Sequence, residues 1–104
     1  MIRQFEVFEN PDDVTRPEAP YLVVLQSHHL DALDTVIVAP LMRLKSSAAQ
    51  SKVMVEVRFV SETLTANLTF LANIERALLR RRAGSLTDYE DDIRRALDRL
   101  FTGF

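Results

Sequence analysis

The chain has 104 residues, of which 47% are hydrophobic and 27% charged, proportions typical of a soluble globular protein. We expect one domain over residues 1–104, with one modest core. The formal net charge of −2 argues against direct nucleic-acid binding. Cysteine is absent, which excludes disulfides and thiolate chemistry. Neither a signal-peptide core nor the ~20-residue apolar run of a membrane helix is present, so we expect a cytoplasmic protein that makes no membrane contact.

The first half of the chain predicts three strands joined by polar loops. Residues 3–9 alternate between apolar and polar, and Pro11 breaks that strand. Residues 21–25 are apolar on both faces, which predicts a strand buried on both sides, either within the sheet or at a subunit contact. Residues 35–39 predict another buried strand, which ends at Pro40 because proline lacks a ladder N–H.

The middle of the chain predicts a loop and then a hairpin. Residues 45–52 are small and polar, as surface loops are. Residues 53–60 alternate strictly and predict a half-buried strand. A turn at Ser61 and Glu62 then leads into a strand over residues 63–68.

Residues 69–82 carry conflicting signals. Their composition and the spacing of Leu71, Ile74 and Leu78 favour a helix that ends before Gly84. A strand in this segment would require tertiary pairing that overrides helix propensity.

Residues 85–104 give the clearest helical pattern. Thr87 and Glu90 have the spacing of a capping box, and acidic residues precede basic ones, as the helix dipole favours. Gly103 is placed to end the helix. Phe104 and the last aromatic residue of the apolar stripe either fold back onto the core or form an apolar tip for a partner. The stripe consists of Tyr89, Ile93, Ala96, Leu97, Leu100 and Phe101.

No set of side chains in the sequence indicates catalysis or metal binding. His28 and His29 are adjacent, so on a strand they would point apart rather than chelate one ion. Ser27, His28 and Asp31 supply the letters of a Ser-His-Asp set, but many loops do so. We therefore expect a protein that is not an enzyme and that holds no metal or cofactor.

Three consecutive arginines, Arg80, Arg81 and Arg82, stand in a chain of net negative charge. They could contact phosphate. With the acidic balance elsewhere, a solvated face or a clamp for an acidic peptide is favoured.

Several stretches together resemble the CcdB family. They are FEVFENP from residue 5, YLVVLQSHHLDALDTVIVAPL from residue 21, FLANIERALLRRRAGSL from residue 70 and YEDDIRRALDRLFTGF from residue 89. The similarity is weakest over residues 42–54. It implies a mainly β (α+β) fold, an SH3-like barrel or antiparallel sheet of the CcdB/MazF type with one C-terminal α-helix.

The resemblance also implies a function. CcdB proteins are toxins of type II toxin–antitoxin systems and form two-fold homodimers without a catalytic site. The best-studied members bind the A subunit of DNA gyrase, a topoisomerase II, and trap it on cleaved DNA. A CcdA-like antitoxin strips the toxin from gyrase, and the toxin–antitoxin complex represses its own operon. Operator DNA is thus a partner only through that complex.

Carried onto this sequence, the resemblance places gyrase contacts after the second strand and at the helix tip. These residues are Ser27, His29, Leu30, Asp98, Phe101, Thr102, Gly103 and Phe104. For the ambiguous segment it implies a short helical turn around residues 70–73 and a strand near residues 77–81. Arg80, Arg81 and Arg82 would then decorate an edge or hairpin and receive an acidic antitoxin tail.

Two positions depart from the family pattern. Thr102 stands where plasmid-borne members carry a tryptophan that stacks on gyrase, and His29 stands where an apolar residue is expected. Losing an aromatic anchor commonly costs about 2 kcal/mol or more, so weaker gyrase binding is expected.

Two other interpretations stay open. One is an attenuated or non-gyrase-targeting protein with the toxin fold that binds only its antitoxin. The other is a MazF-like endoribonuclease, which would need a general acid and base in a basic groove.

Overall fold

The computed structural model describes residues 2–43 and 51–103. Most of the loop predicted at residues 45–52 therefore lies outside the described residues, as does Phe104. None of the helices in the described ranges is long and apolar enough to cross a membrane.

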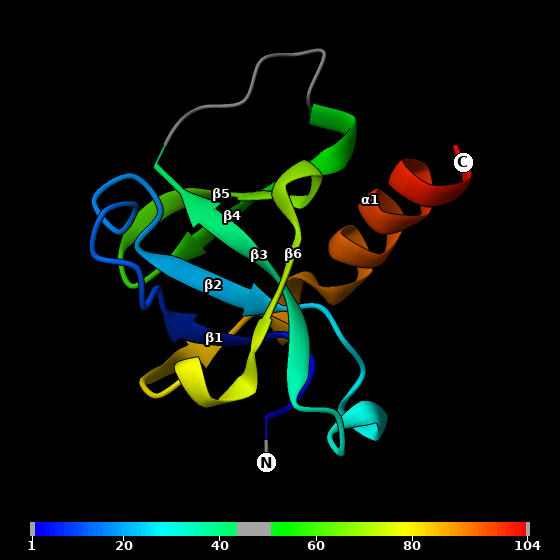
Figure 1. Cartoon of the computed structure of the whole chain (residues 1–104). Helices are drawn as coiled ribbons and strands as arrows, with labels where there is room; N and C mark the ends of the chain where they lie inside the picture. Colours follow the sequence, from blue (N-terminus) through cyan, green and yellow to red (C-terminus); the bar gives the residue numbers. More distant parts are fainter. Residues whose placement is uncertain (1, 44–50, 104) are drawn as a thin grey trace.

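Strands of the described residues form one curled antiparallel sheet, followed by the helix α1 (Glu90–Thr102) (Figure 1). The strand order is β4-β5-β3-β2-β1-β7, and β6 pairs with β3. The predicted mainly β fold with one C-terminal helix is confirmed. The strands are β1 (Glu6–Glu9), β2 (Tyr21–Val24), β3 (Thr35–Met42), β4 (Met54–Phe59), β5 (Glu62–Asn67), β6 (Ala72–Glu75) and β7 (Arg82–Ser85).

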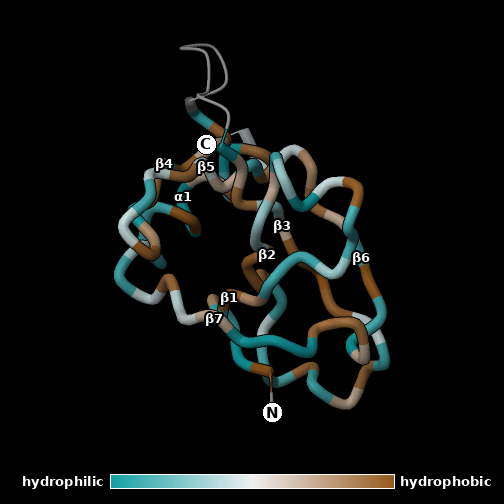
Figure 2. Tube along the Cα trace, turned by 90° about the vertical axis from the view of Figure 1, so that its left-hand side faces the viewer, coloured by the Kyte–Doolittle hydropathy of each residue, from teal (hydrophilic) through white to brown (hydrophobic). Residues whose placement is uncertain are grey.

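The sheet has a hydrophobic core on each side, which explains why residues 21–25 are apolar on both faces. Val23 enters the core beneath α1, where it packs with Ile93 and other side chains, whereas Val24 enters the opposite core beside Leu79. Figure 2 shows α1 and β6 on opposite sides of β2 and β3. The two-sided apolar pattern is thus satisfied within one chain, and a second subunit is not needed to explain it.

β3 continues through Pro40, so the prediction that proline ends this strand is wrong. The Leu25 amide donates to the Ile37 carbonyl at 2.9 Å. Because hydrogen-bonded and non-bonded pairs alternate, the 22–40 pair is non-bonded and the proline nitrogen points to the other edge. On that edge β6 pairs only up to Val38 and β5 only from Leu41, so the proline lies between partners.

The β4–β5 hairpin turns one residue earlier than predicted. Phe59 pairs with Glu62, and Val60 and Ser61 between them have φ angles of 50° and 61°. Positive φ at both positions defines a type I′ turn, which normally carries asparagine or glycine. The predicted turn at Ser61 and Glu62 missed this register because the usual residues are absent.

Residues 69–82 contain neither a long helix nor the strand predicted near residues 77–81. A 3-10 turn at Leu68–Phe70 precedes β6, and another at Arg76–Leu78 precedes β7. Pairing of β6 with β3 satisfies the backbone and thereby overrides the helix propensity of this segment. The Arg76–Leu78 turn occupies part of the predicted strand, and β6 and β7 lie on either side of it.

The helix α1 begins at Glu90, after a 3-10 turn over Thr87–Tyr89. Thr87 lies inside that turn, and its amide donates to Ser85 Oγ at 3.2 Å. No side-chain cap is found at the start of α1, so the predicted Thr87–Glu90 capping box does not form. The predicted stop at Gly103 is confirmed by its left-handed φ of 81°.

Candidate functional site

The residues predicted after the second strand lie on a short 3-10 turn, His28–Leu30. Ser27 Oγ caps this turn by accepting from the His29 amide at 3.2 Å. His29 is exposed, and Leu30 is 50% exposed. This turn therefore presents an imidazole and an apolar side chain to solvent, while Ser27 positions them.

His28 faces inward from the same turn. Its Nδ1 atom is buried and has no hydrogen-bond partner, and its ring lies 4.7 Å from the His29 ring. In the part of the chain that the structure describes, no group of three or more potential ligands could hold a metal ion. Among the described residues no side-chain hydrogen bond joins Ser27, His28 and Asp31, so a Ser-His-Asp arrangement is not formed.

The predicted residues at the end of α1 form an exposed tip. Phe101 is 69% exposed, and Asp98 and Thr102 are also exposed. Thr102 Oγ1 donates to the Asp98 carbonyl at 2.5 Å. The Gly103 amide donates to the Arg99 carbonyl at 3.0 Å, which closes the helix and turns the chain away from its axis. Of the two readings of Phe101, the exposed tip is the one that the structure supports.

The structure separates these two clusters within one chain. In Figure 1 the His28–Leu30 turn lies at the foot of the molecule and the end of α1 lies near the top. A single gyrase-facing patch containing all the predicted residues is therefore not formed by one chain alone in this arrangement.

The three consecutive arginines have different surroundings. Arg82 forms an ion pair with Glu6, whose side chain is only 11% exposed. Burial by itself would raise the pKa of Glu6, but hydrogen bonds from the Arg3 amide and the Arg82 guanidinium lower it below its ordinary value. Arg82 is thus engaged in a structural ion pair.

Arg80 and Arg81 are available to a partner. Arg81 Nη1 lies 3.9 Å from Glu9 Oε2, a long pair between exposed side chains. Arg80 Nε donates to the Ala77 carbonyl at 3.4 Å, and no carboxylate of the described residues lies within ion-pair distance of it.

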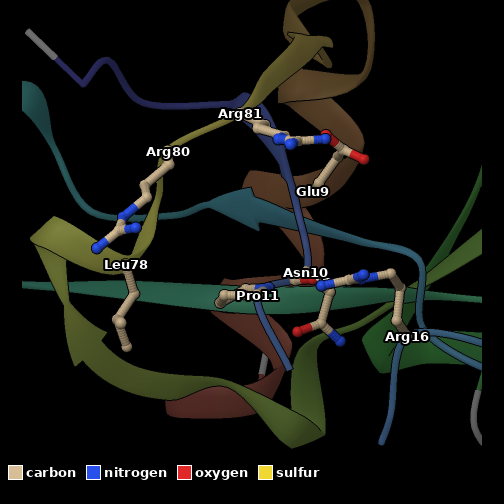
Figure 3. A pocket seen from close by; sticks show the side chains of 7 residues that line it. All are labelled: Glu9, Asn10, Pro11, Arg16, Leu78, Arg80 and Arg81. Atoms are coloured by element: carbon tan, nitrogen blue, oxygen red, sulfur yellow. Dashed lines mark hydrogen bonds and ion pairs between the residues drawn. The ribbon is translucent and has the colours of Figure 1, made fainter. Parts of the chain in front are cut away.

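Arg80 and Arg81 line a polar concavity of about 410 Å³ (Figure 3). Arg16 lies across this concavity from Arg80, beside Asn10. Sequence reasoning missed Glu9 and Arg16. Glu9 reaches the arginine segment because β1 pairs with β7 and the Glu9 amide donates to the Arg81 carbonyl at 2.9 Å, and Arg16 reaches it through the loop over residues 10–20. The break at Asn10 and Pro11 indicated a turn, but it did not indicate where the residues after the turn would lie in the fold.

The curled antiparallel sheet with one C-terminal helix is a fold of the MazF/CcdB type. The solved structure of Mycobacterium tuberculosis toxin MazF-mt6 is similar with a TM-score of 0.72 and 17% identity, over 95% of this chain and 96% of that chain. A sequence model of the CcdB protein family matches residues 4–103. The chain therefore belongs to the CcdB family. No curated protein matches the chain.

Proposed function

We propose that this protein is the toxin of a type II toxin–antitoxin system that binds the A subunit of DNA gyrase and holds it on cleaved DNA. It acts by binding and performs no chemistry. The observation that carries the proposal is the exposed Phe101 beside the left-handed Gly103 at the end of α1, in a chain of the CcdB family.

The helix tip is suited to such binding. An exposed aromatic side chain desolvates well and supplies contact area at little cost in conformational entropy. Gly103 adopts a φ of 81°, so the residue after it can leave the helix axis toward a partner. In a two-fold homodimer the tip is present twice, which suits a two-fold target such as the gyrase A dimer. Ser27, His29 and Leu30 form a second contact region.

A CcdA-like antitoxin neutralises the toxin and uses the arginine segment. Arg80 and Arg81 are exposed and weakly paired, so they can meet carboxylates of a disordered acidic tail. The complex, rather than the toxin alone, contacts operator DNA, because the toxin has a net charge of −2.

Calorimetry against the purified gyrase A fragment from the native host tests the gyrase proposal. Thr102→Trp should tighten binding by about thirtyfold, because an aromatic anchor contributes about 2 kcal/mol. Removal of Gly103 and Phe104 should abolish binding and growth arrest but leave antitoxin binding intact. Phe70→Ser is the matched control, because Phe70 is also exposed (59%) but lines a concavity with Leu22 and Ile74 and is not part of α1.

Growth arrest without detectable gyrase binding would refute gyrase as the target. Absence of both gyrase binding and growth arrest would favour the interpretation that the protein binds only its antitoxin. Cleavage of RNA by the purified wild type, lost on Glu9→Gln, would favour the MazF-like endoribonuclease, because Glu9 is the one carboxylate among the described residues that line the polar concavity.

A further inference from the structure

Two concavities on the face of the molecule opposite α1 join into one groove. The polar concavity of Figure 3 and an apolar one of about 540 Å³ share Asn10, Pro11 and Leu78 as lining residues. The shared residues form the boundary between the two halves. We refer to the combined feature as the 78–81 groove.

The apolar half is floored by the sheet. Leu22 of β2, Val38 and Pro40 of β3 and Ile74 of β6 form this floor. Phe70 stands at its rim with 59% of its surface exposed, and Leu78 is 44% exposed. Large apolar side chains this exposed, gathered in a concavity, mark a binding surface rather than an ordinary protein exterior.

The polar half carries three guanidinium groups and one carboxylate. Arg16 is held by Asp13 at 2.9 Å and by the Asn10 carbonyl at 2.8 Å. Arg81 is only loosely paired with Glu9, and Arg80 bonds a backbone carbonyl alone. Two of the three arginines can therefore exchange their present contacts for a ligand carboxylate.

The boundary between the two halves, which includes Asn10, is already ordered by hydrogen bonds within the chain. The Asn10 side-chain amide donates to Thr15 Oγ1 at 2.9 Å and to the Ala19 carbonyl at 2.8 Å. The Asn10 backbone amide donates to the Pro20 carbonyl at 3.0 Å. This buried asparagine closes the loop over residues 10–20 on itself, so a ligand meets an ordered groove and loses less free energy to ordering.

We propose that the 78–81 groove binds an extended peptide segment in which apolar side chains are followed by carboxylates. The apolar side chains lie between Phe70, Ile74 and Leu78, and the carboxylates meet Arg80 and Arg81. This proposal rests on the proposed function only in taking the natural peptide from the antitoxin. Compared with the antitoxin-binding segment of residues 80–82 expected from the sequence, the groove also includes the apolar half and Arg16. It does not include Arg82, because Arg82 forms an ion pair with Glu6.

The charges of the groove determine which half of the groove takes the acidic part of the peptide. Asp12 and Glu18 line the apolar half, so an acidic residue at that end is repelled while the arginine end attracts it. The same carboxylates disfavour nucleic acid, whose phosphates would run along the whole groove. An amphipathic acidic peptide matches both halves.

Titration of the ¹⁵N-labelled protein with a synthetic peptide tests the proposal. The probe has about ten residues, which span roughly 33 Å when extended, close to the 35 Å longest dimension of the molecule. Its first half carries leucine and its second half glutamate, each separated by serine. We expect saturable amide shifts confined to residues 10–19, β3, β6 and residues 78–81.

Variants of both molecules separate the two halves. Arg80→Ser with Arg81→Ser should weaken binding about five- to thirtyfold and flatten its salt dependence, because two exposed charge contacts are lost. Phe70→Ser should weaken binding without changing that salt dependence. Arg58→Ser removes one exposed positive charge on β4, outside the groove; it is the control for loss of charge elsewhere and should bind as the wild type does. The peptide with glutamine for glutamate should bind more weakly.

The proposal would be overturned if the Arg80→Ser, Arg81→Ser double variant bound the peptide as tightly as the wild type does. Amide shifts outside the groove, or the absence of saturable shifts, would also overturn it. Stronger binding of a ten-nucleotide RNA to the same amides would assign the groove to nucleic acid and also overturn it. Shifts of these amides on dilution without peptide would assign it to a second copy of the chain. Gyrase is absent from this titration, so its outcome is independent of the gyrase test.

Discussion

Gly84 is the residue at which β7 passes closest to the core. A Cβ atom placed there would lie 2.9 Å from Cε1 and Cζ of Phe59, a buried side chain. The position therefore selects glycine for lack of space, and no unusual backbone angle is involved.

Gly84→Ala should reduce the free energy of unfolding by about 1–3 kcal/mol, because the core would be overpacked. Urea unfolding measures this. A double variant with Phe59→Leu should recover part of the loss, since the crowding ring is then removed. Independent, additive losses in the two single variants would contradict the proposed contact.

The Glu6–Arg82 ion pair makes stability depend on pH. Burial alone would raise the pKa of Glu6, but the Arg3 amide and Arg82 lower it below its ordinary value near 4.5. A carboxyl with a lowered pKa stabilises the fold above its unfolded-state pKa, and that stabilisation is lost as the pH falls through the folded-state pKa.

The free energy of unfolding of the wild type should therefore decline as the pH falls below about 4.5, and less steeply in Glu6→Gln. Arg82→Ser should cost about 1 kcal/mol at neutral pH, because Glu6 stays buried without its partner. Arg80→Ser should cost less than about 0.5 kcal/mol, as exposed substitutions usually do. Urea titrations over the acidic range measure all three. Equal costs for both arginines would show that Arg82 has no distinct structural role.

At the scale of the element, α1 is divided into a buried root and an exposed tip. Ile93 is fully buried and Ala96 is 1% exposed, whereas Phe101 is 69% exposed. Leu97 packs against the core but is only half-buried. Of the apolar stripe predicted from the sequence, Ile93 therefore lies fully in the core and Leu97 only partly.

Ile93→Ala should reduce the free energy of unfolding by about 2–5 kcal/mol, because a fully packed site is emptied. Leu97→Ala should cost less, about 1–3 kcal/mol, since part of that side chain already meets water. Phe101→Ala should cost less than about 0.5 kcal/mol, while it weakens gyrase binding. Calorimetric unfolding of the three variants measures how the loss in free energy of unfolding decreases from Ile93 to Phe101. A loss at Phe101 as large as that at Ile93 would show that the tip packs onto the fold.

At the scale of the whole molecule, the oligomeric state remains a prediction. Apolar strand surface at residues 21–25 was the sequence argument for a homodimer, but the two cores bury that strand within one chain. The large apolar side chains of the described residues that stay exposed include Leu30 and Leu33 on one loop, Phe70 and Leu78 beside β6, and Phe101 at the helix tip, together with Val14, Ile37 and Val60.

Light scattering at micromolar concentration should show a dimer. Because the strand is already buried, Leu33→Ser should weaken the dimer without lowering the unfolding free energy of the monomer by more than about 0.5 kcal/mol. Phe70→Ser serves as the comparison on another face. A monomer at all concentrations would remove the two-fold argument for gyrase binding. A dimer weakened only by Phe70→Ser would move the interface to the 78–81 groove.

The sequence by itself determined the features that local physics controls. The alternation of β4 and the apolar stripe with its terminal glycine in α1 depend on neighbours along the chain, and both were predicted from the pattern. The identity of β2 as a strand buried on both sides was equally clear from five consecutive apolar residues.

Only the tertiary structure decided the features that depend on residues far apart. Residues 69–82 have the propensity of a helix, but pairing of β6 with β3 makes them strand and turn. Pro40 stays within β3 because of the particular register of three neighbouring strands. The different environments of Arg80, Arg81 and Arg82 follow from the positions of Glu6 and Glu9, more than seventy residues earlier in the chain. Such contacts carry no local signal, because the chain between the partners does not restrict which side chains meet.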